Sequence, residues 1–247
     1  MVLGVSVDIS DCRKILPLIE KYGHIIKHIQ IYLDDSSFDT MYNTIANIID
    51  KRLSYSFHAN GDLNMADINQ YNTAIQTIDM VSFFHGVFSN FHVGYYDSSK
   101  QSRDKALSQV VELTRNLCTY AYQKNVAIHM ENDIYSSDGS ERLGTILADW
   151  IQIHRIKQQN FFMCYDIGHA NISFDNAYIY RQYIPKIGSF HIHNNDGIND
   201  LHTPFGNSGK INLDKVLLEL RQTDKYVILE NKFDGYNNAL QYLCDIL

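Results

Sequence analysis

The chain has 247 residues, 45% of them hydrophobic, which is enough to bury the core of one large domain or two small ones. Its 28 acidic residues outnumber its 21 basic ones and give a formal charge of -7, so the chain lacks the overall attraction for phosphate that bulk nucleic-acid binding requires. Its four cysteines show no CxxC spacing, and it has neither a charged-then-apolar leader nor an apolar run near membrane-spanning length. Reduced thiols and a cytoplasmic location are therefore expected.

Short β-type runs alternate with longer helical patterns along the first half of the chain. Ile15, Leu18 and Ile19 recur at helical spacing, and Gly23 is placed to end the helix that they predict. Asp67 has the side chain of a helix N-cap, which predicts that a further helix starts there. The predicted strands are residues 2–9, 25–33, 53–59, 87–93 and 126–130, and the predicted helices are residues 11–22, 38–50, 67–83 and 103–124.

The second half of the chain repeats this alternation. Strands alternating with helices call for parallel strands joined by helical crossovers, and eight such units favour a closed (β/α)8 TIM barrel over an open doubly wound sheet. No GxGxxG follows the first strand and no linker divides the chain, so residues 1–247 are expected to form a single domain. The predicted strands here are residues 161–165, 187–193 and 226–229, and the predicted helices are residues 141–156, 176–183, 213–221 and 237–246.

Ligand-type side chains occupy the ends of six consecutive predicted strands. In a TIM barrel the carboxyl ends of the strands converge on one mouth, where functional sites are built. A single His or Glu at a strand end is usually only solvated or hydrogen-bonded, but six in succession are poorly explained by independent accidents. The six residues are His58, His92, Glu131, Asp166, His191 and Glu230.

The loop after the seventh predicted strand adds more residues of the same kind. His191 and His193 are two apart, so both side chains point to the same face of an extended strand. Asp200 and His202 follow Gly197 and can fold back over that face. The alternative is a polar loop that simply faces solvent.

A divalent metal ion would explain why acidic and imidazole side chains gather at one place. Converging carboxylates raise one another's pKa unless a cation neutralises them. Mixed oxygen and nitrogen ligands suit zinc, manganese, cobalt or iron better than calcium, and the lack of thiolate ligands argues against a closed structural zinc site. The sequence therefore predicts a divalent metal cofactor, with one ion expected and up to three accommodated by the available side chains.

Four segments resemble the successive signatures of the xylose isomerase-like TIM-barrel superfamily, which includes sugar isomerases and epimerases as well as endonuclease IV. They are IHMEND at 128–133, CYDIGHA at 164–170, FHIHNNDGINDLHTPFG at 190–206 and ILEN at 228–231. The resemblance covers the second half of the chain strongly and the first half only through His58 and His92. One departure is the GNSG at 206–209, where the family usually has a compact Gly-Glu-Gly turn.

The sugar epimerase branch of this superfamily implies one metal and two catalytic carboxylates. The resemblance assigns the metal to a quartet of residues from the last four strands, and it implies that Glu131 and Glu230 relay a proton through an enediolate. It also implies that His169 and His193 contact substrate hydroxyls, although His193 would replace His191 as ligand if the strand register slipped. The implied metal ligands are Glu131, Asp166, His191 and Glu230.

The endonuclease IV branch implies instead a phosphodiesterase with nine ligands around three zinc ions. The acidic balance, the short chain and the scarcity of Arg and Lys in the loops weigh against this alternative, because phosphate contacts need such groups. The matching positions are His58, His92, Glu131, Asp166, His169, His191, Asp200, His202 and Glu230.

The remaining alternatives are another metal-dependent lyase or hydrolase on the same scaffold, or a binding protein without activity. A small-molecule sugar is the expected substrate, whereas nucleic acid and membrane are disfavoured as partners. A homo-oligomer stays open, because the sequence does not determine the oligomeric state.

Overall fold

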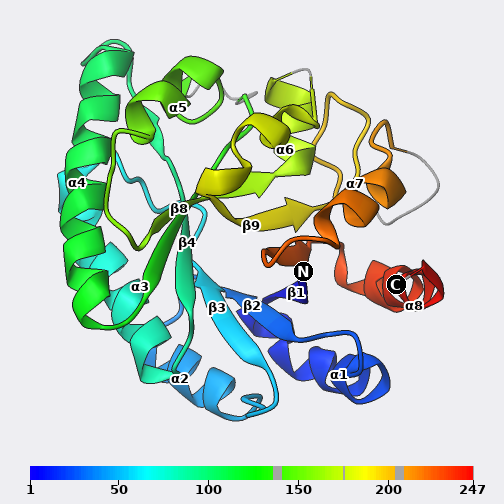
Figure 1. Ribbon diagram of the computed structural model, residues 1–247. Helices are drawn as coiled ribbons and strands as arrows, with labels where there is room; N and C mark the ends of the chain where they lie inside the picture. Colours follow the sequence, from blue (N-terminus) through cyan, green and yellow to red (C-terminus); the bar gives the residue numbers. More distant parts are fainter. Residues whose placement is uncertain (136–140, 175, 204–208, 247) are drawn as a thin grey trace.

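A closed barrel of parallel strands organises the molecule (Figure 1). The computed structural model describes residues 1–135, 141–174, 176–203 and 209–246. Within these residues the barrel order is β1-β10-β9-β8-β6-β4-β3-β2, which confirms the predicted (β/α)8 TIM barrel. The barrel strands are β1 (Val2–Asp8), β2 (His28–Tyr32), β3 (Ser54–His58), β4 (Phe88–His92), β6 (Ala127–Glu131), β8 (Phe161–Asp166), β9 (Ile187–Ile192) and β10 (Tyr226–Leu229).

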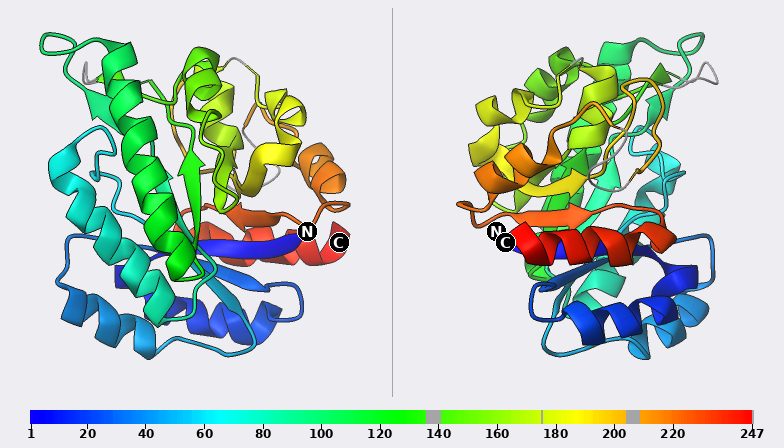
Figure 2. Two further views of the ribbon diagram at one scale, coloured as in Figure 1. Left: turned by 60° about the vertical axis from the view of Figure 1, so that its left-hand side comes forward. Right: turned by 90° about the vertical axis from the view of Figure 1, so that its right-hand side faces the viewer.

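Helices surround the barrel, and the two chain termini lie close together in both views of Figure 2. No helix in the described part of the chain is long and apolar enough to cross a membrane. The α-helices are α1 (Leu16–Tyr22), α2 (Phe38–Ala46), α3 (Tyr71–Phe83), α4 (Arg103–Gln123), α5 (Leu147–Ile153), α6 (Ile167–Ser173), α7 (Leu213–Leu220) and α8 (Tyr236–Ile246). Short 3-10 turns are η1 (Ile9–Ile15), η2 (Ile68–Gln70), η3 (Ile179–Gln182), η4 (Ile184–Lys186) and η5 (Phe233–Gly235).

Three predicted helices differ from the structure. The one at 11–22 begins as the 3-10 turn η1, and α1 starts only beside Pro17, a residue that the first turn of a helix accepts because its missing N–H needs no partner there. The one at 141–156 shrinks to α5, because β7 (Glu141–Arg142) pairs antiparallel with β5 (Tyr95–Tyr96). The one at 176–183 is only the turn η3.

An unpredicted helix, α6, begins directly after Asp166. The Asp166 side chain accepts a hydrogen bond of 2.6 Å from the backbone N–H of His169, so the carboxylate caps the first turn. The sequence after Asp166 has no clear helical periodicity, so the cap made by Asp166 is the local feature that favours a helix here. Asp166 therefore ends a strand and starts a helix at the mouth of the barrel.

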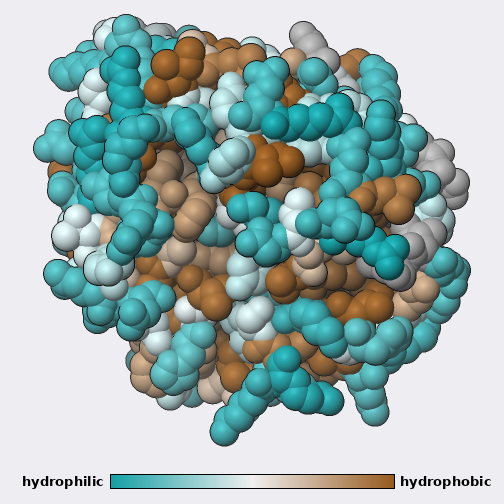
Figure 3. All heavy atoms as spheres, viewed as in Figure 1, coloured by the Kyte–Doolittle hydropathy of each residue, from teal (hydrophilic) through white to brown (hydrophobic). Residues whose placement is uncertain are grey.

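Apolar side chains fill the layer between strands and helices, whereas the barrel interior is largely polar. Val5, Val7 and Ile31 belong to the outer apolar core, in which Trp150 is also buried. The ring of Phe88 on β4 stacks on that of His28 from β2, two strands away in the barrel, and on that of His129 from the neighbouring β6, so these side chains face the interior. His129 therefore has a structural position at the floor of the barrel. On the surface, hydrophilic and hydrophobic side chains are interspersed (Figure 3).

Candidate functional site

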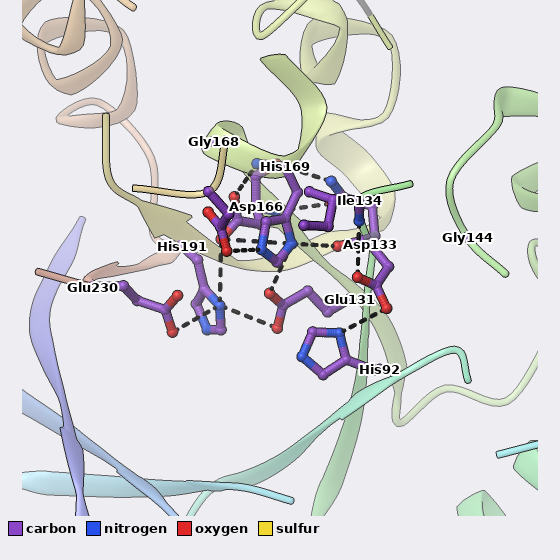
Figure 4. Close-up of polar contacts among 12 residues, drawn as sticks. His92, Glu131, Asp133, Ile134, Gly144, Asp166, Gly168, His169, His191 and Glu230 are labelled. Carbon is purple, nitrogen blue, oxygen red and sulfur yellow. Dashed lines mark hydrogen bonds and ion pairs between the residues drawn. The ribbon is translucent and has the colours of Figure 1, made fainter. Parts of the chain in front are cut away.

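Four ligand-type side chains converge where the last four barrel strands end. Glu131 closes β6, Asp166 closes β8, His191 lies in β9 and Glu230 follows β10. All four are buried, and one potential ligand atom from each lies within 4.8 Å of the others. They face one another in Figure 4. The structure thus brings together the four residues of the predicted metal quartet.

Buried polar atoms in this quartet lack hydrogen-bond partners. Nδ1 of His191 lies 3.1 Å from Oε2 of Glu131 and 3.1 Å from Oε1 of Glu230, yet neither contact has hydrogen-bond geometry. Oδ2 of Asp166 has no partner among the described residues either. Each such buried group costs about 1–3 kcal/mol if nothing satisfies it. A cation among the four residues would satisfy all of these atoms at once.

The Glu131 carboxylate is fixed by side chains from the next two strands of the barrel, β4 and β3. Nε2 of His58 lies 3.1 Å from its Oε2, and the side-chain amide of Asn90 donates to the same oxygen. Burial favours the protonated acid, but the neighbouring imidazoles of His191 and His92 outweigh it and hold the pKa of Glu131 well below its ordinary value. The sequence analysis did not identify Asn90, although this residue precedes His92 by two positions and therefore lies on the same face of the strand.

A second cluster lies over the quartet and includes residues from the loop after β9. Its members are His169, His193, Asp200 and His202. Oδ2 of Asp200 is 3.1 Å from Nε2 of His202 and 3.4 Å from Nε2 of His169, and Oδ1 is 3.5 Å from Nε2 of His193. The predicted return of Asp200 and His202 over the strand face therefore occurs. His193 also lies 3.2 Å from Oδ1 of Asp166, which links the two clusters. His191 thus belongs to the quartet and His193 to the cluster above it.

Ring-nitrogen partners in both clusters follow the pattern of metal-ligating histidines. Nδ1 faces a backbone carbonyl in His58 (2.6 Å), His169 (2.8 Å) and His202 (2.7 Å), and because a carbonyl can only accept, Nδ1 carries the proton. In a neutral ring Nε2 then carries a lone pair and is a hydrogen-bond acceptor, although it faces a carboxylate oxygen, which is also an acceptor. Two acceptors can face each other only if the ring is protonated or a cation lies between them. The residues present fit a metal.

His202 adopts an unusual backbone conformation to reach its place. Its φ of 48° lies in the left-handed region, which is uncommon for residues other than glycine and often marks functional sites. Its ring stacks on that of His193 with centroids 3.9 Å apart. Although burial opposes it, the hydrogen bond to Asp200 raises the pKa of His202 to about 9. These contacts hold the left-handed turn in position over the mouth.

His92, predicted as a ligand in the three-zinc arrangement, lies beside these clusters, with its ring centroid 5.1 Å from that of His58, but its ring nitrogen is directed to another carboxylate. Its Nδ1 is 3.4 Å from Oδ2 of Asp133, a buried carboxylate that sequence reasoning missed (Figure 4). Arg142 pairs with the same carboxylate at 3.0 Å. The only sequence signal for Asp133 is its position two residues after Glu131. No candidate metal cluster in the described residues includes His92.

A cavity of about 280 Å³ opens beside the quartet, on the side of β1 and β2. Glu230 and His202 form one part of its lining, and Asp8, Tyr32 and Asn231 form another. Its volume is close to the lower end of the range of small-molecule sites, about 300–1,000 Å³. A ligand of sugar size in this cavity would reach Glu230 directly.

Comparisons with known proteins agree with this fold. Residues 53–246 match a family model described as the xylose isomerase-like TIM barrel, whereas no curated protein sequence gives a significant match. Similar solved structures include a D-tagatose 3-epimerase-like protein, with a TM-score of 0.84, 20% identity, and coverage of 100% of this chain and 97% of that one. An L-ribulose 3-epimerase has a TM-score of 0.70, 17% identity, and coverage of 100% and 87%. The probable 3-DHS dehydratase AsbF from Bacillus anthracis has a TM-score of 0.70, 17% identity, and coverage of 99% and 99%.

Proposed function

The chain belongs to the xylose isomerase-like TIM-barrel family, and on that premise we propose that it is a divalent-metal-dependent isomerase or epimerase of a small sugar or polyol. The observation that carries the proposal is the position of Glu131 and Glu230 on either side of His191, each 3.1 Å from its Nδ1. The similarity in fold to a D-tagatose 3-epimerase-like protein and an L-ribulose 3-epimerase supports this choice of chemistry.

The quartet of Glu131, Asp166, His191 and Glu230 would hold the metal. Three carboxylates and one imidazole suit zinc, manganese or cobalt, and one ion per chain is expected. When bound, such an ion polarises a carbonyl and its neighbouring hydroxyl, which acidifies the C–H bond between them.

The two glutamates would move the proton. Glu230 lines the cavity, and its carboxylate would accept a proton from a substrate carbon there. Oε2 of Glu131 is held by His58 and Asn90, which fixes the second carboxylate on the other side of His191. A carboxylate on each face of the substrate carbon can remove a proton from one face and return it to the other. His169 and His193 would orient substrate hydroxyls from above.

The second cluster supports one alternative, an endonuclease IV-like phosphodiesterase with several zinc ions. His169, His193, Asp200 and His202 lie within 4.8 Å of one another, as further metal ligands would. The formal charge of -7 and the carboxylates of Asp8 and Asp11 in the cavity weigh against a nucleic-acid substrate. A lyase reaction is the other alternative, since a probable dehydratase is among the similar structures.

Metal content and turnover test the proposal together. The protein is purified without chelator, its metal is quantified, and a panel of ketoses and aldoses is assayed with zinc, manganese or cobalt. We expect one ion per chain and interconversion of a ketose, both abolished in Glu230→Gln and retained in Glu112→Gln, which changes an exposed carboxylate on α4. Three zinc ions with cleavage of an abasic-site duplex would replace the proposal with the phosphodiesterase.

A further inference from the structure

His92 and Glu131 occupy matching positions on neighbouring strands. They are register partners in the pairing of β4 with β6, so their side chains lie on the same face of the sheet and at the same depth in the barrel. Glu131 points into the mouth as a member of the quartet, and His92 therefore points there too (Figure 4). A substrate that contacts the Glu131 carboxylate would thus lie beside His92 as well.

The His92 ring has one nitrogen engaged within the protein and one without a partner. Nδ1 is buried and faces Oδ2 of Asp133 at 3.4 Å. Because a carboxylate can only accept, the proton of a neutral ring lies on Nδ1. Nε2 has no hydrogen-bond partner in the described part of the chain and, unlike Nδ1, is not fully buried, since the side chain is 13% exposed. A ligand in the mouth can therefore reach Nε2.

Asp133 is itself held from two sides, which fixes the orientation of the His92 ring. Its carboxylate is 2% exposed and accepts from the backbone N–H of Ile134 at 2.8 Å. Nη1 of Arg142 lies 3.2 Å from its Oδ1 and 3.0 Å from its Oδ2. Arg142 belongs to β7, whose pairing with β5 joins the loops that follow β4 and β6. This small ribbon thus supports the carboxylate that orients His92.

The chemistry of Nε2 points to a hydroxyl group as its partner. In a neutral ring Nε2 accepts a hydrogen bond, and in a protonated ring it donates one. A hydroxyl can both donate and accept, whereas a carbonyl oxygen can only accept, so a hydroxyl matches His92 in either protonation state. Because Glu131 lies at the same depth, this hydroxyl would belong to a carbon near the one on which Glu131 acts.

We propose that His92 is a specificity-determining residue that binds one hydroxyl group of the substrate through Nε2, and that Asp133 and Arg142 are positioning residues that hold its ring. The inference rests on the proposed function, which places the substrate against Glu131.

Steady-state kinetics of His92 variants test this inference in metal-loaded protein. For the ketose that the wild type turns over, His92→Leu should raise KM about tenfold while kcat falls less than about threefold, as expected for the loss of about one net hydrogen bond. His92→Gln keeps a polar group at this position and should show a smaller rise. His24→Leu, at an exposed histidine, is the matched control.

Two results would overturn the role of His92. One is an unchanged KM in both His92 variants. The other is a lower metal count in the saturated His92→Leu protein, because His92 would then be a metal ligand.

Monodeoxy analogues of the same ketose provide a readout that a merely structural role would not move. A site built to bind a hydroxyl rejects the analogue that lacks it, because the protein group is then left unpaired. The penalty in kcat/KM for one analogue should be about tenfold smaller in His92→Leu than in the wild type, whereas the penalties for the other analogues should not change. Identical penalties in both proteins for every analogue would contradict the proposal.

Asp133→Asn and Arg142→Met test the positioning roles. Asp133→Asn keeps the volume of the side chain and also serves as the second variant if His92→Leu does not fold. Both changes should raise KM less than His92→Leu does and should reduce the penalty for the same analogue. If neither variant changes that penalty, the orientation of His92 does not depend on this pair.

Calorimetric titration of the metal-loaded protein with the panel of free ketoses separates this inference from the proposed function, because it needs no turnover. Binding that depends on His92 without any isomerisation would refute the reaction and support the site. Turnover that is indifferent to His92 would do the opposite. Absence of both binding and turnover would overturn both.

Discussion

Nε2 of His58 lies 3.1 Å from Oε2 of Glu131, which joins the end of β3 to the end of β6 across the mouth of the barrel. The strand between them, β4, contributes Asn90 to the same oxygen. The orientation of the first quartet residue is therefore set by side chains from the half of the chain that contributes no member of the quartet.

Replacing His58 should weaken metal binding without changing the number of ions. His58→Asn removes the imidazole that orients Glu131, and loss of such a supporting contact typically costs about 10- to 100-fold in metal affinity or activity. Titration with a competing chelator measures the affinity, and metal analysis of saturated protein gives the count. A fall in the saturated count, rather than in affinity, would indicate that His58 is itself a ligand and would favour the arrangement with several zinc ions.

Asp166→Asn should separate the charge of this side chain from its capping role. Asn is as good an N-cap as Asp, so the hydrogen bond from the His169 N–H to position 166 can persist and the melting temperature should change little. The loss of charge should lower metal affinity by at least about tenfold and abolish activity. Asp166→Ala removes both features and should cost about 1 kcal/mol more in unfolding free energy than Asp166→Asn. Equal metal affinity in Asp166→Asn and wild type would exclude Asp166 as a ligand.

The two buried histidines at the floor of the barrel should make folding stability depend on pH. Burial lowers the pKa of His28 to about 3 and that of His129 well below its usual value. The folded state therefore binds fewer protons than the unfolded state, whose histidines titrate near pH 6.5. The stabilisation is fully present above about pH 6.5 and is lost as the pH falls toward 3, at about 1.4 kcal/mol per pH unit for each group.

Urea unfolding between pH 4 and pH 8, with chelator present so that metal loss does not contribute, measures this dependence. His28→Gln should reduce the slope by up to about 1.4 kcal/mol per pH unit, whereas His24→Gln, a change at an exposed histidine, should leave it intact. A slope unaffected by His28→Gln would show that other groups cause the acid sensitivity.

Arg103 should be important for stability but not for chemistry. It donates to both oxygens of Asp149, a carboxylate that is 1% exposed and also accepts from the Gly144 N–H at 2.7 Å. Arg103→Met would leave this buried charge without its cation and should lower the unfolding free energy by about 3 kcal/mol. Replacing both partners, in Arg103→Met with Asp149→Leu, should cost less. Metal content of the folded protein should match the wild type in either case, and a loss of metal would place this pair within the site.

The sequence by itself determined the barrel and the members of the quartet, because both follow from local patterns. Strands alternating with helices leave a parallel closed sheet as the compact arrangement, and the carboxyl ends of its strands must meet at one mouth. Side chains at those ends, such as Glu131 and Asp166, were identifiable from position alone. Their chemical roles stay predictions until metal is measured.

Only the tertiary structure decided which partner each of these side chains meets. His191 and His193 share one face, but a rise of about 3.3 Å per residue sets them roughly 7 Å apart in depth, so they enter different clusters. Asn90 meets Glu131 only because a strand distant along the chain lies beside its own, and α6 depends on a cap made by Asp166. Such contacts depend on barrel closure and loop return, which a local pattern in the sequence does not encode.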